Sequence, residues 1–267
     1  MKEQILSMLA PGHPWGKHIF YYDCVDSTNN LAKAMAAQGC PHGTVILAGK
    51  QTGGRGRLGR SFASPAGMGV YLSVILRYPC APSRLMHLTC AAAVAVRDAM
   101  IAESGIVPGI KWINDLVWEG RKIAGILTEL SLNPHSGDVD FAIIGIGVNC
   151  RQSAGDFPLE LREKAASLSM AAGRSVDPCA IAAAIIQHLY SMDSILLTGK
   201  SSLMERYRSS CITIGQEVSI QRAGCNVRHG KALAIDDDGA LVVEFPDGHR
   251  EALNSGEVSV RGMYGYL

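Results

Sequence analysis

A loop rich in glycine and arginine, residues 51–60, constrains this chain more than any other stretch, because apolar strands are predicted on both sides of it, at 44–48 and 70–76. Its glycines carry no Cβ and let the backbone approach a ligand closely. Its arginines are permanently charged, and their planar guanidinium groups match phosphate and carboxylate. Because these charges repel one another, we expect a bound anion to order the loop. The sequence therefore indicates an anion-binding loop over a nucleotide or an acyl phosphate.

Two common nucleotide-binding motifs do not explain this loop. The pattern Gly54-x-Gly56-x-x-Gly59 matches the dinucleotide fingerprint, which needs a helix at the third glycine and an acidic residue about 20 positions later. Residues 61–69 contain a proline and two glycines and cannot begin a long helix, and residues 27–97 contain no acid at all. No Gly-Lys-Ser/Thr sequence of a P-loop occurs. A solvated basic loop without a ligand remains the alternative.

The charge distribution is uneven although the net charge is only +1. Residues 27–97 carry eight lysines and arginines and no acid, whereas acidic residues gather near the C-terminus. The low net charge argues against a dedicated nucleic-acid-binding protein. The basic segment is expected to face an anionic ligand or acidic elements of the same chain.

Cysteine and histidine usage indicates a reduced protein without a resident metal. The eight cysteines are scattered and form no CxxC pair, as is typical of buried thiols in a cytoplasmic protein. The eight histidines show no ligand spacing such as HExxH. The N-terminal residues do not resemble a signal peptide, and no apolar run reaches membrane-spanning length. We therefore expect a cytoplasmic protein with no bound metal and no membrane contact.

Periodicity and turn residues predict an α+β fold of a large and a small domain in 267 residues, of which 48% are hydrophobic. In residues 1–212 we expect a mixed β-sheet packed with helices, with strands at 20–22, 44–48, 70–76, 110–118, 122–130 and 141–149, and helices at 31–37, 85–101, 158–170, 178–197 and 201–208. Residues 213–267 are predicted to form a small β barrel, with strands at 217–221, 227–235, 240–245, 249–253 and 257–260.

Glycines interrupt two of the predicted strands. Gly125 lies inside 122–130, and Gly145 and Gly147 lie inside 141–149. An interior glycine in a strand marks close approach of a ligand or of another part of the chain. The glycines therefore predict a slot across adjacent strands, filled by either a ligand or a packed helix.

Five motifs in this order resemble those of biotin protein ligases and span residues 26–149. They are Asp-Ser-Thr-Asn at 26–29, Gly-Arg-Gly-Arg-x-Gly-Arg at 54–60, Lys-Trp-x-Asn-Asp-Leu at 111–116, Lys-x-x-Gly-Ile-Leu-x-Glu at 122–129 and Gly-x-Gly-x-Asn at 145–149. One departure is Ile113, where that family usually has proline, and we expect it only to shape a turn. The resemblance implies a class II synthetase-like catalytic fold with a C-terminal SH3-like β barrel.

The resemblance also implies a reaction. The carboxylate of biotin attacks the α-phosphate of ATP, which binds with Mg²⁺, to give biotinyl-5′-AMP and pyrophosphate. A lysine of a biotin carboxyl carrier protein then displaces AMP. Such a reaction needs positioning and charge stabilisation rather than an enzyme nucleophile. This agrees with a sequence rich in arginine and glycine that lacks a Ser/His/Asp or Cys/His arrangement.

Matching positions give each residue an implied role. The catalytic residues would be Arg57, Lys122 and Asp115. Biotin would contact Ser27, Thr28, Asn29, Gln51, Gly54, Arg55, Gly56, Arg57, Lys122, Gly125, Gly145 and Gly147. ATP would contact Arg57, Arg60, Phe62, Asn114, Asp115, Asn149 and Arg261, with Phe62 stacked on adenine.

Other functions remain open from the sequence. A lipoate or octanoate ligase would share the fold and the acyl-adenylate chemistry, although the full arginine loop resembles the biotin enzymes more closely. A small-molecule sensor without catalysis is a second alternative. A Gly-Arg nucleic-acid-binding module is a third, but it would need interleaved aromatic residues.

Two further expectations concern partners. Larger members of the resembled family carry an N-terminal DNA-binding module of about 60 residues, and only 25 residues precede Asp26. We therefore expect no DNA binding. A homodimer is possible through exposed strand edges near residues 137–144.

Overall fold

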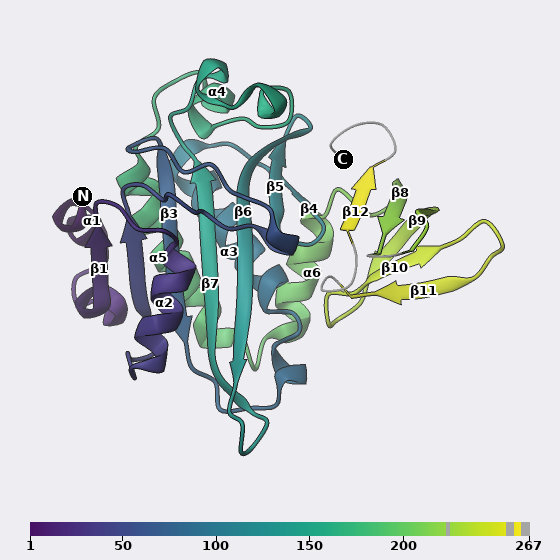
Figure 1. Ribbon diagram of the computed structural model, residues 1–267, viewed down its shortest axis with the longest axis horizontal. Coiled ribbons are helices and arrows are strands. Elements are labelled where there is room, and N and C mark those ends of the chain that lie inside the picture. Colours follow the sequence, from purple (N-terminus) through teal and green to yellow (C-terminus); the bar gives the residue numbers. More distant parts are fainter. Residues whose placement is uncertain (223–224, 255–258, 263–267) are drawn as a thin grey trace.

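Runs of apolar and β-branched residues form a seven-stranded mixed sheet at the centre of the protein (Figure 1). The structure is a computed structural model that describes residues 1–222 and 225–254, and the backbone of 259–262. The strands lie in the order β1-β2-β3-β7-β6-β5-β4. Their bounds are β1 Ile19–Tyr22, β2 Thr44–Ala48, β3 Gly69–Leu76, β4 Gly109–Lys111, β5 Asp115–Trp118, β6 Arg121–Leu132 and β7 Val139–Asn149. Only the β1–β2 pair of this sheet is parallel, and β7 lies at its centre.

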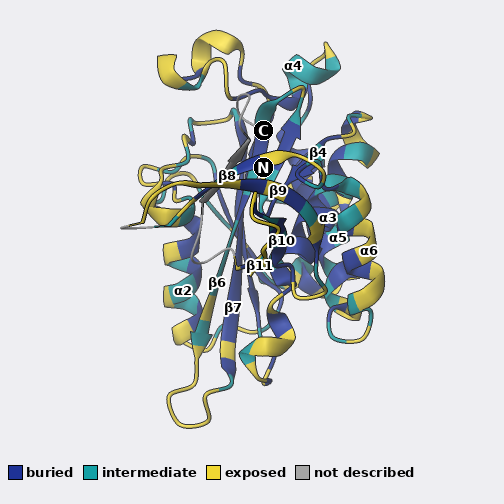
Figure 2. Cartoon of the chain, turned by 90° about the vertical axis from the view of Figure 1, so that its right-hand side faces the viewer, coloured by how far each residue is buried: buried dark blue, intermediate teal, exposed yellow. Residues whose placement is uncertain are grey.

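Helices cover both faces of this sheet (Figure 2). The helix α2, Thr28–Ala37, packs on one face, while α3, Leu88–Ser104, and α5, Pro178–Ile195, pack on the other. The helix α5 begins as predicted, because the Asp177 carboxylate accepts a hydrogen bond from the backbone N–H of Cys179. Further helical segments are α1 Lys2–Met8, α4 Leu168–Ala172 and α6 Lys200–Ser210, and 3₁₀ turns at Pro14–His18, Arg57–Gly59, Pro82–Leu85, Ala154–Asp156 and Leu159–Leu161.

The alanine-rich helix α3 is a core helix. All of its alanines except Ala102 are almost fully buried between the sheet, α5 and α6. The expectation that no apolar run reaches membrane-spanning length is wrong for Pro82–Ser104, which comprises α3 and the preceding turn and is long enough and apolar enough to qualify as a membrane span. Because 67% of the most apolar part of this segment is buried inside the protein, its composition is explained by packing within the core.

A second, antiparallel sheet follows residue 213, in agreement with the predicted small β domain. Its order is β11-β10-β9-β8-β12, with bounds β8 Glu217–Gln221, β9 Arg228–Ile235, β10 Leu241–Glu244, β11 Arg250–Leu253 and β12 Ser259–Gly262. Figure 1 shows it beside α6 and β4, at the right-hand end of the central sheet. Apolar residues of both sheets, such as Ile110 and Val218, belong to one continuous core. The small sheet is therefore docked on the large one.

Three sequence-based expectations are wrong. Residues 110–118 are a hairpin instead of one strand: the chain reverses at 112–114, so that Lys111 pairs with Asp115. The peptide bond between Trp112 and Ile113 in this turn is cis. Residues 158–170 are mostly irregular, because their backbone pairs with Lys122. Finally, the edges of β7 are not exposed, because β3 and β6 flank it.

Candidate active site

The interior glycines lie side by side on the sheet face that α2 partly covers. Gly125 of β6 is directly opposite Gly147 of β7 on one side and Asp115 of β5 on the other. Gly145, two residues further along β7, is opposite Ser73 of β3. The predicted slot across adjacent strands therefore exists.

Side chains occupy the space that these glycines leave, and one of them, Asn29 above Gly145, belongs to the packed helix α2. A Cβ at Gly145 would overlap the Asn29 amide, and one at Gly147 would lie 2.5 Å from the Phe62 ring. A Cβ at Gly125 would lie 2.8 Å from Lys122 Nζ. Each glycine thus lets one side chain approach the sheet closely, which explains why a larger residue does not fit.

Lys122 and Asp115 form an ion pair at the end of the glycine row. Lys122 Nζ lies 2.7 Å from Asp115 Oδ1, and both side chains are largely shielded from solvent. The same ammonium group is 5.9 Å from the centroid of the Phe62 ring. An ammonium group held by a carboxylate beside an aromatic ring can accept an anionic ligand and orient it.

Arg57 reaches the same region from the arginine loop. Its Nη1 donates a hydrogen bond of 3.0 Å to Asn114 Oδ1, and Asn114 Nδ2 in turn donates to the carbonyl oxygen of Ile126. Burial lowers the pKa of the Arg57 guanidinium, while the nearby charge of Asp115 opposes that effect. A guanidinium in this surrounding remains protonated and carries its charge in a partly dry environment, where electrostatic interactions are stronger.

The arginine loop closes on itself as a tight turn across the sheet, in front of β7 and β6 in Figure 1. The backbone N–H of Phe62 donates to Gly54 O, and that of Gly56 donates to Arg60 O. Its tip needs two left-handed residues, Leu58 with φ of 55° and Gly59 with φ of 73°. This turn holds Phe62 over the sheet and presents Arg57 and Arg60 at its tip.

A chain of hydroxyl and amide groups lines the site on the side of α2. The Gln51 Oε1 atom accepts hydrogen bonds from the backbone N–H and the hydroxyl of Thr28, at 2.8 and 3.1 Å. Ser73 Oγ lies 2.8 Å from Thr28 Oγ1 and 2.6 Å from Asn29 Oδ1. On the other side, Gln51 Nε2 donates to Ser64 Oγ. Buried groups of this kind can recognise a polar, uncharged ligand such as an amide or urea.

Glu129 anchors this network to the arginine loop. Its carboxylate accepts from Asn29 Nδ2 at 2.8 Å and pairs with Lys33 at 2.5 Å and with Arg55 at 3.4 Å. Burial alone would raise the pKa of Glu129, but the bonds from Lys33 and Asn29 and the charges of Lys33 and Arg55 lower it below its ordinary value. Arg55 also donates to the Asn30 amide at 2.9 Å. The loop is therefore tied to both α2 and β6.

The irregular segment after β7 holds the backbone of Lys122 in place through hydrogen bonds. The backbone N–H of Lys122 donates to Lys164 O, and Lys122 O accepts from the N–H of Ala166. Asn149 Nδ2 donates to Ala166 O, and Asn149 Oδ1 accepts from the Gln152 amide. Asn149 is thus used within the protein, and its predicted contact with a nucleotide remains a prediction.

The structure brings most of the sequence-predicted site residues together on one side of the sheet. Ser27 is buried directly before α2, and Arg60 is exposed on the loop. Arg261 lies in β12 opposite Ser219, but its side chain is outside the part that the structure describes. Sequence reasoning missed Ser73 and Ser64, and gave Glu129 no role. Ser73 is a lone polar residue within an apolar strand, a signal that could have revealed it.

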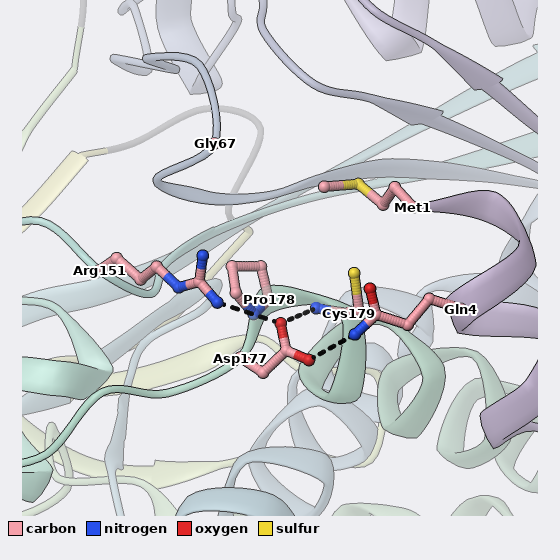
Figure 3. Close-up of a pocket in the computed structure, with 7 residues that line it drawn as sticks. All are labelled: Met1, Gln4, Gly67, Arg151, Asp177, Pro178 and Cys179. Carbon is pink, nitrogen blue, oxygen red and sulfur yellow. Dashed lines mark hydrogen bonds and ion pairs between the residues drawn. The ribbon is translucent and has the colours of Figure 1, made fainter.

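A separate depression of about 330 Å³ does not belong to this site (Figure 3). Asp177 lies in it and accepts hydrogen bonds from Gln4 and Arg151 as well as from the start of α5. Its lining residues are Met1, Gln4, Gly67, Arg151, Asp177, Pro178 and Cys179. Its charged groups already bind one another around a helix terminus, so the depression is explained by helix capping.

The described residues offer no cluster of three or more His, Cys, Asp or Glu side chains that could hold a metal ion. Asp115 is the carboxylate of the glycine row, opposite Gly125. One carboxylate suits Mg²⁺ that arrives already coordinated by nucleotide phosphates, because this ion commonly binds to one or two protein carboxylates and to the substrate.

Comparison with known families identifies both parts of the chain. Residues 21–149 match the Biotin/lipoate A/B protein ligase family, and residues 213–261 match the Biotin protein ligase C terminal domain. The first match contains all five motifs, and the second falls on the small antiparallel sheet. The resemblance drawn from the motifs is thereby confirmed.

Individual relatives agree with this result. The Bifunctional ligase/repressor BirA of Bacillus spizizenii is 37% identical over 87% of this chain and 71% of that protein. The Biotin--[acetyl-CoA-carboxylase] ligase of Mycobacterium tuberculosis is 32% identical over 87% of this chain and 85% of that protein. A structure of the biotin protein ligase from Aquifex aeolicus in complex with biotin and ATP superposes with a TM-score of 0.77, at 26% identity over 92% of this chain and 99% of that one. The chain therefore belongs to the biotin protein ligase family and is a ligase.

Proposed function

We propose that this ligase activates biotin with ATP and transfers it to a lysine of a biotin carboxyl carrier protein. In the first step a biotin carboxylate oxygen attacks the α-phosphorus of ATP, and pyrophosphate leaves. In the second step the lysine amine attacks the acyl carbon, AMP leaves, and the amine loses a proton as the amide forms. The observation that carries this proposal is that Lys122 and Arg57, which are held by the consecutive residues Asp115 and Asn114, meet beside the glycine row.

Lys122 would bind the biotin carboxylate and later the acyl-phosphate oxygen. Its ammonium group lies over Gly125, between Asp115 and the Phe62 ring, so an incoming carboxylate finds a cation that is already oriented. Gly147 and Gly145 would admit the bicyclic ring and the valeryl chain once Phe62 and the Asn29 amide, which occupy the space above them, move aside. Preorganised charge of this kind lowers a barrier without reorganisation during the reaction.

The polar chain of Thr28, Gln51, Ser73 and Asn29 would bind the ureido head of biotin. Ser27 lies beside it, and Gly54, Arg55 and Gly56 would close over the activated carboxyl group. The hydroxyl and amide groups already bind one another in a fixed arrangement. A site built from buried hydrogen-bonding groups discriminates strongly against a ligand that cannot pair with them.

Arg57 and Arg60 would neutralise the phosphates, and Asp115 would orient Mg²⁺–ATP or the incoming amine. Phe62 would stack on adenine, with Asn114, Asn149 and Arg261 as further contacts. Phe62 packs over Gly147 in this structure, so stacking on adenine would require its ring to turn away from the sheet. The division into a catalytic domain, residues 1–212, and a C-terminal domain, residues 213–267, remains part of this proposal.

Lipoate or octanoate is the main alternative substrate, because the N-terminal match covers biotin and lipoate ligases alike. The C-terminal match is to the biotin enzymes by name and favours biotin. The M. tuberculosis relative is named for acetyl-CoA carboxylase, which supports a carboxylase carrier subunit as the partner. A cytoplasmic location, a homodimer and the absence of DNA binding also belong to this proposal.

ATP–pyrophosphate exchange tests the proposal directly. We would measure exchange in parallel with biotin, lipoate and octanoate, with Mg²⁺ present. Exchange with biotin alone is the expected result. Exchange only with lipoate or octanoate would identify that acid as the substrate instead of biotin. A folded protein that shows no exchange with any of the three acids would contradict adenylation and favour the sensor function.

A further inference from the structure

The two halves of the turn between β4 and β5 contact different parts of the protein. Its second half holds the site, because Asn114 binds Arg57 and Asp115 binds Lys122. Its first half is bound by later parts of the chain. The Trp112 indole Nε1–H donates a 2.8 Å hydrogen bond to Gly239 O, and its backbone N–H donates to Thr213 Oγ1 at 2.9 Å. Trp112 is only 4% exposed, so both bonds are protected from water.

Gly239 is the end of a rigid turn, residues 236–239, between β9 and β10. The Asp236 carboxylate accepts hydrogen bonds from the backbone N–H groups of Asp238 and Ala240, at 2.9 and 2.8 Å. Such a side-chain bond to the following backbone fixes a turn. The turn is also tied to α6 by two ion pairs, Asp237 with Arg208 and Asp238 with Lys200.

Only glycine fits at position 239. Its φ is +87°, which other residues rarely adopt, and a Cβ there would lie 2.9 Å from Cys90 Sγ in the core helix α3. The close approach brings the carbonyl oxygen within reach of the Trp112 indole. The acidic turn is thus seated against α3, α6 and the β4–β5 hairpin at the same time.

We propose that the turn 236–239 positions the catalytic groups of the proposed ligase reaction, with Trp112 as the positioning residue. Residues 112–115 are consecutive, so a displacement of Trp112 moves Asn114 and Asp115 and, through them, Arg57 and Lys122. Trp112 touches no reacting atom itself. The C-terminal domain would in this way set the geometry of the adenylation site from outside it.

Trp112→Phe is the variant that tests this positioning. It keeps an aromatic ring in the core but removes the indole N–H donor and leaves Gly239 O unpaired. Trp15→Phe is the matched control, because Trp15 is equally buried at 3% exposure, packs edge-on against Tyr190, and lies at the opposite end of β2 from Gln51. A second control, Lys200→Ala, removes one tether of the same turn and leaves the Trp112–Gly239 bond in place.

The readout is kcat and KM of biotin-dependent pyrophosphate exchange, well below the melting temperature. A misplacement of an ångström at reacting groups can cost up to about a hundredfold in rate. We therefore expect Trp112→Phe to lower kcat by roughly 10- to 100-fold, with less than about a threefold change in the KM for biotin. Trp15→Phe and Lys200→Ala should keep kcat within about twofold of the wild type. Trp112→Phe with an unchanged kcat, at a melting temperature similar to that of Trp15→Phe, would overturn the proposal.

A second measurement separates this inference from the proposed function on which it rests. Backbone amide exchange at Ile126, whose N–H donates to Asn114 O, reports on the hairpin without any substrate. We expect faster exchange there in Trp112→Phe than in Trp15→Phe. If the wild type shows no pyrophosphate exchange, the ligase function fails, but the amide data still decide whether the turn holds the hairpin; equal exchange rates in both variants would overturn the positioning role.

Discussion

Gly125 and Gly147 are directly opposite each other on β6 and β7, and the space above them holds Lys122 and Phe62. The two side chains come from segments about sixty residues apart in the chain, yet neighbouring glycines bring them to within 5.9 Å, from the Lys122 ammonium to the ring centroid. The glycine pair therefore determines how an ammonium group and an aromatic ring meet over the sheet.

Gly147→Ala should displace the Phe62 ring. The new Cβ would lie 2.5 Å from that ring, and overpacking of this kind costs about 1–3 kcal/mol of the free energy of unfolding. The double variant Gly147→Ala/Phe62→Leu provides room again, so the two substitutions should not be additive in urea unfolding. Additive losses of stability would mean that the ring and the glycine are not coupled.

Arg57→Ala should slow adenylation by about 10²–10³-fold, because it removes a preorganised charge from the phosphate region. Pyrophosphate exchange at saturating biotin measures this effect. Arg250→Ala is the control, since Arg250 is a largely exposed arginine that pairs with Glu244 at the surface of the small sheet. Equal activities of the two variants would show that Arg57 is not part of the reaction.

Ser73→Ala should weaken both stability and biotin binding. The hydroxyl is fully buried and lies between Thr28 and Asn29, so its loss leaves a buried acceptor unpaired at a cost of about 1–3 kcal/mol. Ser194→Ala removes an exposed hydroxyl that binds Ser191 O and should change neither quantity. Calorimetric titration with biotin checks the affinity. An unchanged dissociation constant for Ser73→Ala would show that this group of polar side chains does not bind biotin.

The stabilisation that Glu129 contributes to the folded protein should be lost in acid. Its folded-state pKa is lowered below the ordinary value of about 4.5, so the unfolded chain binds a proton more readily than the folded one. The stabilisation is therefore complete above about pH 4.5 and is lost as the pH falls through the folded-state pKa.

The variant Glu129→Gln isolates this effect from that of other carboxylates. It cannot ionise, so it should be less stable than the wild type at pH 7, and the difference should shrink below about pH 4.5. Urea unfolding at both pH values measures it. A difference that stays constant over this range would show that the charge of Glu129 does not contribute.

Strands and helices were predictable where the signal is local. The strand 44–48 and the strand 217–221 have the predicted bounds, because apolar periodicity and turn residues delimit them. The motifs also predicted that Lys122, Asp115 and Arg57 lie together. The carbonyl and amide groups that hold these residues could not be predicted from the sequence.

The errors arise where distant contacts decide the local structure. Residues 158–170 have helical periodicity, but Lys164 and Ala166 bind the backbone of Lys122 instead. The hairpin at 110–118 is stabilised by bonds from Trp112 to residues 213 and 239, which no short window contains. Ser73 is a single polar residue in an apolar strand, and Glu129 follows a threonine in a mixed strand; the partners of both could only be found in the folded chain.

The bond between Trp112 and Gly239 has a consequence for protein synthesis. A chain is synthesised from its N-terminus onward, so all five motifs are translated before residue 150. The partners of Trp112, at positions 213 and 239, are translated after all five motifs, so the hairpin that carries Asn114 and Asp115 stays without its outer support until then. If the turn 236–239 positions the site as proposed, a nascent chain contains the five motifs well before it can hold Asn114 and Asp115 in place.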